Sequence, residues 1–140
     1  MRYLGLDLGT KTLGISLSDN LGLIASKYDT IFFESENYLD ALEKLKPIVL
    51  EFNISTVVLG LPKNMNNTLG FASERSLNFK KLLEDNLNLK VILQDERLTS
   101  VEANNILIKS DISRKKRKKN VDSLSAVIIL QNYLDSRKEE

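Results

Sequence analysis

The sequence predicts an α/β fold in which a five-stranded mixed sheet is flanked by helices. Apolar side chains alternate with a period of two through much of the first 33 residues, which indicates strands. The period then becomes helical, as shown by Leu39, Leu42, Leu45, Val49 and Phe52. Apolar runs and helical patterns alternate from there on, as in α/β proteins. The length of 140 residues suits one domain, which we expect to span residues 1–140.

Five strands are expected. Residues 3–8 and 13–17 alternate on either side of a short turn, and residues 23–33 carry the β-branched and aromatic side chains typical of a third strand. These three strands should form an antiparallel meander. Residues 56–60 and 91–93 are short apolar runs, which predict two buried strands later in the chain.

Helices are expected around the two later strands. The helix over residues 39–52 contains Pro47, which should kink or split it. A second helix should cover about residues 72–87. The segment Thr99-Ser100-Val101-Glu102 is a capping box, so a third helix should start there.

A run of six cations comes before the last helix. We expect the run to form a loop, and its residues are Arg114, Lys115, Lys116, Arg117, Lys118 and Lys119. The last helix should begin at Asn120 or Ser123, and it should lie against the sheet because residues 124–130 are apolar on most sides.

The charge of the chain is unevenly distributed. The 20 basic and 19 acidic residues give a net charge of +1, yet without the six cations 14 basic residues face 19 acidic ones. A mildly acidic body with one dense cationic segment favours local contact with a polyanion. The alternative for this run is a solvated loop or helix surface.

The segment Gly5-Leu6-Asp7-Leu8-Gly9 is the first candidate for function. Alternation places Asp7 beside Gly5 on one face of the strand, which should leave space in front of the acid. A turn with Thr10 and Lys11 follows. Actin-like ATPases and sugar kinases hold nucleotide phosphates with a similar turn, and a class of nucleases uses the strand acid to hold a metal. A buried strand acid without a function is the third alternative.

Composition narrows these alternatives. With no cysteine and no histidine, the chain cannot have a zinc site of the usual kind, a thiol nucleophile or a histidine base. Catalysis must use carboxylates, lysines, hydroxyls or a hard metal. The actin-like ATPases and sugar kinases close two domains around a nucleotide, and a chain of 140 residues is short for two such domains. The length therefore weakens the ATPase alternative. No stretch approaches the ~20 apolar residues of a membrane span, so we expect a cytoplasmic protein without membrane contact.

Further acids follow the later strand and open the last helix. Gln94 follows the strand ending at Leu93, and Asp95 and Glu96 come next, at a strand end where open α/β sheets bind ligands. An ion pair with Arg97 in a solvated loop is the alternative. Asp122 should lie in the first turn of the last helix, where the helix dipole alone would also favour it.

Carboxylates from two strand ends and one helix start, without histidine, fit a site for Mg²⁺ or Mn²⁺ that supports phosphodiester cleavage. Lys11, Thr10 and Arg97 are then candidates for contacts with phosphates, and the cations of residues 114–119 could hold a nucleic-acid backbone.

Four ordered motifs complete the pattern: Gly5-Leu6-Asp7-Leu8-Gly9-Thr10-Lys11, Gly60-Leu61-Pro62-Lys63-Asn64-Met65, Asp95-Glu96-Arg97-Leu98-Thr99-Ser100, and Lys118-Lys119-Asn120-Val121-Asp122-Ser123 with Ile129-Leu130-Gln131-Asn132-Tyr133-Leu134. In order and spacing the chain resembles the YqgF family of pre-16S rRNA nucleases, also described as Holliday-junction resolvase-like. The resemblance implies a ribonuclease H-like fold and a role in maturing the 5′ end of the 16S rRNA precursor. By position it also implies a catalytic and metal-binding triad of Asp7, Glu96 and Asp122, with Asp95 in reserve for Glu96.

The leading hypothesis is therefore a metal-dependent nuclease acting on structured RNA within a pre-ribosomal particle, with branched DNA as a second class of substrate. A non-catalytic RNA-binding assembly factor is the main alternative, and an ATPase is the third. Either a monomer or a homodimer is compatible with the sequence, because only a twofold-symmetric substrate would require a dimer.

Overall fold

The computed structural model describes residues 2–61, 71–95 and 114–138. Within these residues five strands form one mixed sheet in the order β3-β2-β1-β4-β5. The strands are β1 (Tyr3–Leu8), β2 (Thr12–Ser18), β3 (Ala25–Phe32), β4 (Thr56–Leu61) and β5 (Lys90–Asp95). β1, β2 and β3 are antiparallel neighbours, whereas β4 and β5 run parallel to β1. The predicted meander and the five-stranded mixed sheet are confirmed.

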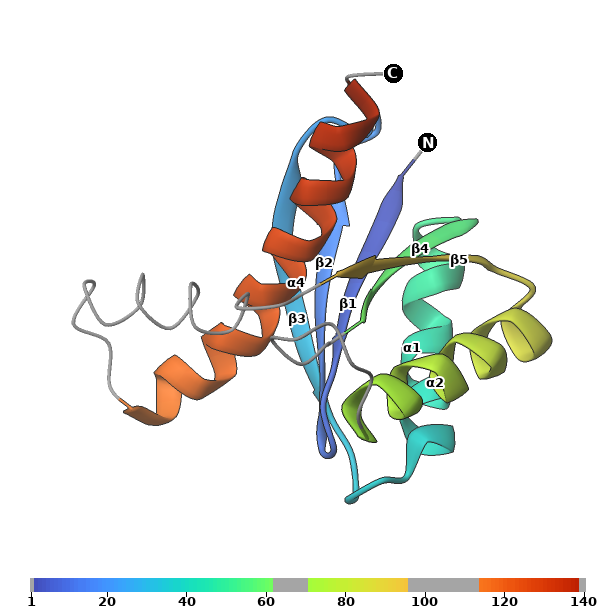
Figure 1. Ribbon diagram of the computed structural model, residues 1–140, viewed down its shortest axis with the longest axis vertical. Helices are drawn as coiled ribbons and strands as arrows, with labels where there is room; N and C mark the ends of the chain where they lie inside the picture. Colours follow the sequence, from blue (N-terminus) through green and yellow to red (C-terminus); the bar gives the residue numbers. More distant parts are fainter. Residues whose placement is uncertain (1, 62–70, 96–113, 139–140) are drawn as a thin grey trace.

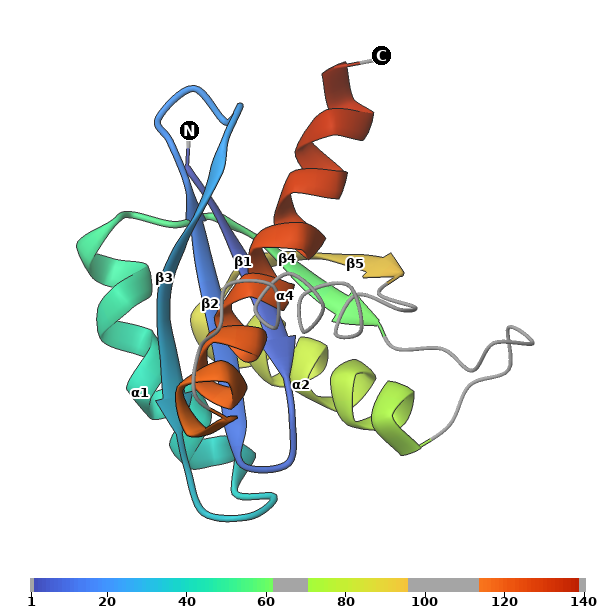
Figure 2. The same cartoon turned by 90° about the vertical axis from the view of Figure 1, so that its left-hand side faces the viewer.

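The helices of the described ranges lie on both faces of this sheet (Figure 1, Figure 2). They are α1 (Tyr38–Glu51), α2 (Phe71–Leu87) and α4 (Arg114–Lys138). Leu4, Leu6 and Leu8 of β1 pack in one apolar cluster with α1 and α2. Tyr3, from the other side of β1, packs with α4 in a second cluster. The alternation of β1 therefore separates two cores, one on each face.

Helix α1 runs without interruption through Pro47, so the predicted split is wrong. Its first turn is capped by the Asn37 side chain, which accepts a hydrogen bond from the backbone N–H of Asp40 at 3.2 Å. Proline removes only one backbone donor, and both Pro47 and the residue four positions earlier, Glu43, lie on the exposed side of the helix. Water can reach the carbonyl that proline leaves without its usual partner.

Helix α4 begins earlier than predicted. It starts at Arg114 rather than at Asn120 or Ser123, so the basic run is helical and the predicted loop over residues 114–119 is wrong. Lysine and arginine are good helix formers, and residues 114–138 contain no glycine or proline that would end the helix. The helix expected to start at the capping box of residues 99–102 lies outside the described residues.

The C-terminal half of α4 is attached to the sheet by polar contacts. The Gln131 side chain accepts a hydrogen bond from the Ala25 N–H at 2.8 Å and donates one to the Leu23 carbonyl at 3.0 Å. Near the end of the helix the Arg137 guanidinium donates to the Tyr3 hydroxyl and lies 4.9 Å from the centre of the Tyr3 ring. These contacts fix α4 to the β2–β3 hairpin and to β1.

Removing the Gln131 side chain should destabilise the fold. We expect Gln131→Ala to lower the free energy of unfolding by about 1–2 kcal/mol, because two backbone groups of the hairpin lose their partner. Urea unfolding measures this difference. The neighbouring Asn132 is exposed, so Asn132→Ala should change stability by no more than about 0.5 kcal/mol. Equal effects of the two substitutions would contradict the role of Gln131.

Candidate functional site

Asp7 lies near the carboxyl end of β1, the middle strand of the sheet. Leu6 and Leu8 on either side of it point into the core with α1 and α2, so Asp7 projects from the face that α4 crosses. It is half-buried. The predicted position of the acid beside Gly5, on the side away from the leucines, is confirmed.

Gly5, the small neighbour of Asp7 on this face of β1, is covered by α4. A β-carbon placed on Gly5 would lie only 2.7 Å from the Leu130 Cβ and 2.8 Å from the Ala126 carbonyl oxygen. The same carbonyl accepts a hydrogen bond from the Ser16 hydroxyl of β2 at 2.7 Å. Glycine is needed here because the helix backbone comes close to the sheet. The hydrogen bond and the close packing hold α4 against β1 at Gly5, two residues before Asp7.

The turn after β1 is fixed from both sides. A hydrogen bond from the Gly9 N–H to the Thr12 carbonyl at 2.7 Å closes the turn. The carbonyls of Thr10 and Lys11 accept further bonds from Glu36 N–H at 2.8 Å and Phe33 N–H at 2.9 Å. Thr10 and Lys11 are themselves exposed. The structure therefore presents a hydroxyl and a cation on a braced turn that starts two residues after Asp7.

β5 brings Asp95 to the same edge of the sheet as Asp7. Leu6 pairs with Leu59, and Leu59 pairs with Leu93, so these residues form one row across three parallel strands. Asp95 pairs with Leu61, two residues beyond that row. It is exposed, and alternation puts it on the sheet face of Val91 and Leu93, which pack in the core with α1 and α2. Asp7 projects from the opposite face.

The other predicted site residues are described only in part. Glu96 and Arg97 lie outside the described residues. Asp122 belongs to α4, eight positions after its first residue, so the prediction that it opens the helix is wrong. The helix extends further toward its N-terminus than the capping signals indicated, and the dipole at its start no longer accounts for this acid. Asp122 is one turn before Ala126, the residue whose carbonyl contacts β2.

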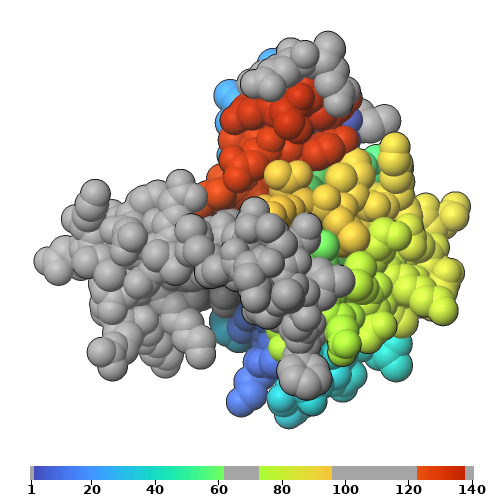
Figure 3. Space-filling model, viewed as in Figure 1, coloured from blue at the N-terminus to red at the C-terminus, as the bar shows by residue number. Residues whose placement is uncertain are grey.

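Among the side chains that the structure describes, no three acids lie close enough together to hold a metal ion. Of the predicted triad only Asp7 belongs to that set. Figure 3 shows α4 and β5 side by side on the surface of the molecule. Asp122 belongs to α4, and Glu96 is the next residue in the sequence after β5.

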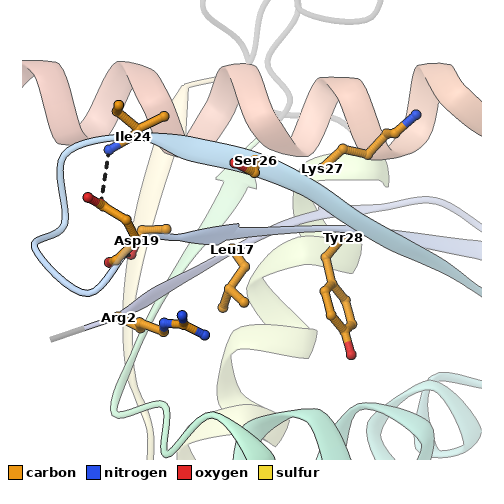
Figure 4. Close-up of a pocket in the computed structure, with 8 residues that line it drawn as sticks. Arg2, Leu17, Asp19, Ile24, Ser26, Lys27 and Tyr28 are labelled. Carbon is orange, nitrogen blue, oxygen red and sulfur yellow. Dashed lines mark hydrogen bonds between the residues drawn. The ribbon is translucent and has the colours of Figure 1, made fainter.

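A groove of about 420 Å³ lies at the other end of the sheet and was not predicted. Its lining includes Arg2, Leu17, Lys27 and Tyr28, which come from the N-terminal end of β1 and from the β2–β3 hairpin (Figure 4). Residues so far apart in the sequence left no motif to find. Arg2 is five residues before Asp7 on β1, about 16 Å along the strand, so this groove is separate from the Asp7 region.

The hairpin beside this groove is held by Asp19. Its carboxylate accepts hydrogen bonds from the N–H groups of Leu23 at 2.7 Å and Ile24 at 3.1 Å. These bonds favour the ionised carboxylate and keep the pKa of Asp19 below its ordinary value. Asp19 therefore stabilises the turn between β2 and β3.

Comparison with known proteins identifies the family. The family model described as "RuvX: Holliday junction resolvase" matches residues 1–136. The chain belongs to this RuvX family. A protein named "Putative pre-16S rRNA nuclease" from Geobacillus sp. (strain WCH70) is 51% identical over 137 residues, covering 98% of this chain and 99% of the relative. Its namesake from Bacillus subtilis (strain 168) is 49% identical over 136 residues, covering 97% and 99%. The resemblance inferred from the motifs is confirmed.

Two solved structures of low sequence identity share the fold of this RuvX family member. Thermus thermophilus RuvC in complex with a Holliday junction matches with a TM-score of 0.60 and 13% identity, covering 99% of this chain and 96% of RuvC. The Fowlpox virus resolvase in complex with Holliday junction DNA matches with a TM-score of 0.57 and 17% identity, covering 98% and 99%. The predicted ribonuclease H-like fold is confirmed.

Family membership also bears on the alternatives for Asp7. The family is one of hydrolases that act on phosphodiester bonds, which favours the nuclease alternative over the nucleotide-holding one.

None of the helices within the described ranges is long and apolar enough to cross a membrane.

Proposed function

We propose that the protein is a metal-dependent nuclease of one domain that hydrolyses phosphodiester bonds in structured RNA, and that it matures the 5′ end of pre-16S rRNA. The observation that carries the proposal is Asp7, a half-buried acid near the carboxyl end of the middle strand, on the face crossed by α4. The names of the relatives that match nearly the whole chain supply the substrate. Such a protein would work in the cytoplasm on a pre-ribosomal particle, as a monomer or a homodimer.

The metal would be Mg²⁺ or Mn²⁺, held by Asp7, Glu96 and Asp122. A chain without histidine or cysteine offers hard oxygen donors, which these ions prefer. We keep Glu96 as the second ligand because its reserve Asp95 follows Leu93 onto the face of the sheet opposite to Asp7. When bound, the ion would supply an activated water and stabilise the charge on the leaving oxygen.

The remaining residues would bind and orient the nucleic acid. Lys11 lies on a turn braced by Phe33 and Glu36, so its ammonium group starts from a fixed backbone beside the Asp7 strand. Lys11 and Arg97 would contact phosphates near the scissile bond. The cations of residues 114–119 would hold the phosphate backbone further away, and their place in α4 ties them to the helix that packs against β1.

The test is cleavage of a pre-16S rRNA fragment by the purified protein with Mg²⁺ or Mn²⁺. We expect a cut that shortens the 5′ extension. A four-way DNA junction should be assayed in parallel, because the family description favours branched DNA as a second candidate substrate. Intact RNA and intact junctions under both metals would overturn the proposed activity. Tight RNA binding without cleavage would support the non-catalytic assembly factor instead.

Neutralising part of the basic run should weaken RNA binding. We expect the quadruple substitution of Lys115, Lys116, Arg117 and Lys118 by glutamine to lower the affinity and to flatten its dependence on salt. Each lost phosphate contact should reduce the slope of log affinity against log salt by about 0.7–0.9. Fluorescence anisotropy at several salt concentrations measures this slope. An unchanged slope would mean that the run does not contact the RNA backbone.

A further inference from the structure

We propose that Gln94 belongs to the same site as Asp7 and positions the substrate by donating an amide N–H to a phosphate oxygen. This inference rests on the proposed nuclease function and adds a residue that the motifs did not indicate. It follows from the register of the three parallel strands and from the glycine that separates the two side chains.

The register puts Gln94 on the same level of the sheet as Asp7. Gln94 pairs with Gly60 of β4. The last printed pair between β1 and β4 joins Leu6 to Leu59, so Asp7 and Gly60 occupy the next level. Asp7, Gly60 and Gln94 thus form one row across β1, β4 and β5. Two strand spacings separate the α-carbons of Asp7 and Gln94, which is roughly 10 Å.

The same row also lies on one face of the sheet. Val58, two residues before Gly60, packs with Ile129 and Leu130 of α4. Gln94 pairs with Gly60 and therefore projects from that α4 side, as Asp7 does. Gly60 carries no side chain between them, and glycine inside a strand often marks a place where a ligand approaches the backbone. Gln94 is half-buried.

The chemistry of a carboxamide suits this position. A carboxylate cluster that holds a divalent ion repels the phosphate it must bind, so a neutral donor beside it can bind a phosphate oxygen without competing for the ion. Glutamine has two N–H donors for this purpose. Hydrogen bonds to a charged acceptor are stronger than those between neutral groups. Gln94 would thus orient the substrate and leave the metal to the acids.

Two substitutions test the position and the role separately. Gln94→Glu keeps the shape but places a fourth carboxylate opposite Asp7, so we expect Mn²⁺ to bind about tenfold more tightly by titration calorimetry. Gln94→Leu removes the donor and should weaken the binding of a fluorescein-labelled pre-16S RNA fragment about tenfold in Ca²⁺. In the same assay Gln94→Glu should bind RNA more weakly than Gln94→Leu, because its charge repels phosphate. Asn132→Asp adds an acid at an exposed position of α4 and should change neither affinity.

The outcomes separate this inference from the proposed function. Mn²⁺ affinity of Gln94→Glu that equals that of the wild type would overturn the placement of Gln94 at the site, whether or not the protein cuts RNA. A role in packing alone predicts the reverse order of RNA affinities, with the isosteric Gln94→Glu the milder change. If the wild type cuts RNA and the Gln94 variants bind Mn²⁺ and RNA as the wild type does, the inference about Gln94 is refuted and the proposed nuclease function stands. The wild type could instead fail to bind or cut RNA while Gln94→Glu still binds Mn²⁺ more tightly. That result would refute the nuclease function and the substrate role of Gln94, but the placement of Gln94 beside Asp7 would stand.

Discussion

Asp7→Asn is expected to reduce cleavage of the pre-16S RNA fragment by about a thousandfold or more. Asparagine has almost the same size as aspartate but lacks the negative charge that would hold the divalent ion. Loss of metal-assisted charge stabilisation amounts to several kcal/mol, and about 4 kcal/mol corresponds to roughly three powers of ten in rate. RNA binding should persist, because Lys11 and the basic run remain. Single-turnover cleavage with gel readout measures the rate.

The matched control for this substitution is Asp85→Asn. Asp85 is an exposed acid on α2, away from the β1 strand end, and its amide variant should cut at the wild-type rate. Both variants are purified in the same way, so a contaminating nuclease would give equal activity in all three preparations. That result would sink the assignment of cleavage to this protein. Thermal unfolding of Asp7→Asn close to that of the wild type would show that lost activity does not reflect lost folding.

The location of Asp7 could be predicted because strand alternation is a local property. Leu4, Leu6 and Leu8 mark the core face of β1, and this spacing alone places Asp7 on the other face. The hairpin with β2 follows from the same period and from the turn at Gly9. The four ordered motifs then identified the family, which the match over residues 1–136 confirms.

The start of α4 could not be predicted in the same way. Asn120 and Ser123 are good cap residues, and a run of cations is typical of a loop, yet the helix begins at Arg114. A residue that can cap a helix does not force the helix to begin there. The helix extends further wherever the preceding residues favour it and no glycine or proline interrupts it. The misplaced start also made Asp122 look like a first-turn acid, which it is not.

Long-range packing determines other features that the sequence did not reveal. Nothing near Gly5 in the sequence reveals that Ala126 and Leu130 press against it, since these residues lie more than 120 positions later. The face of the sheet on which Asp95 lies likewise follows from the register of β5 against β4, because a one-residue step changes the face. Sequence patterns predict which elements form, whereas these contacts depend on how the elements meet.

Gly5→Ala should be among the most destabilising single substitutions in this protein. The new β-carbon would lie 2.3 Å from the Ser16 hydroxyl oxygen, 2.7 Å from the Leu130 Cβ and 2.8 Å from the Ala126 carbonyl oxygen. Relief requires α4 to move away from β1 and β2, so we expect the free energy of unfolding to fall by about 3 kcal/mol. Chemical denaturation measures this fall, and the melting temperature should drop by roughly 10 °C.

The double variant Gly5→Ala with Ser16→Ala shows which neighbour resists the methyl group. Ser16→Ala alone loses its hydrogen bond to the Ala126 carbonyl and should cost about 1 kcal/mol. It removes the nearest clash but leaves the two clashes with α4, so the double variant should remain well below Ser16→Ala in stability. Full recovery would mean that the serine alone blocks the site. If α4 is the obstacle, Gly5→Ala should also slow RNA cleavage at temperatures where it stays folded, because the helix that carries Asp122 would be displaced from the strand that carries Asp7.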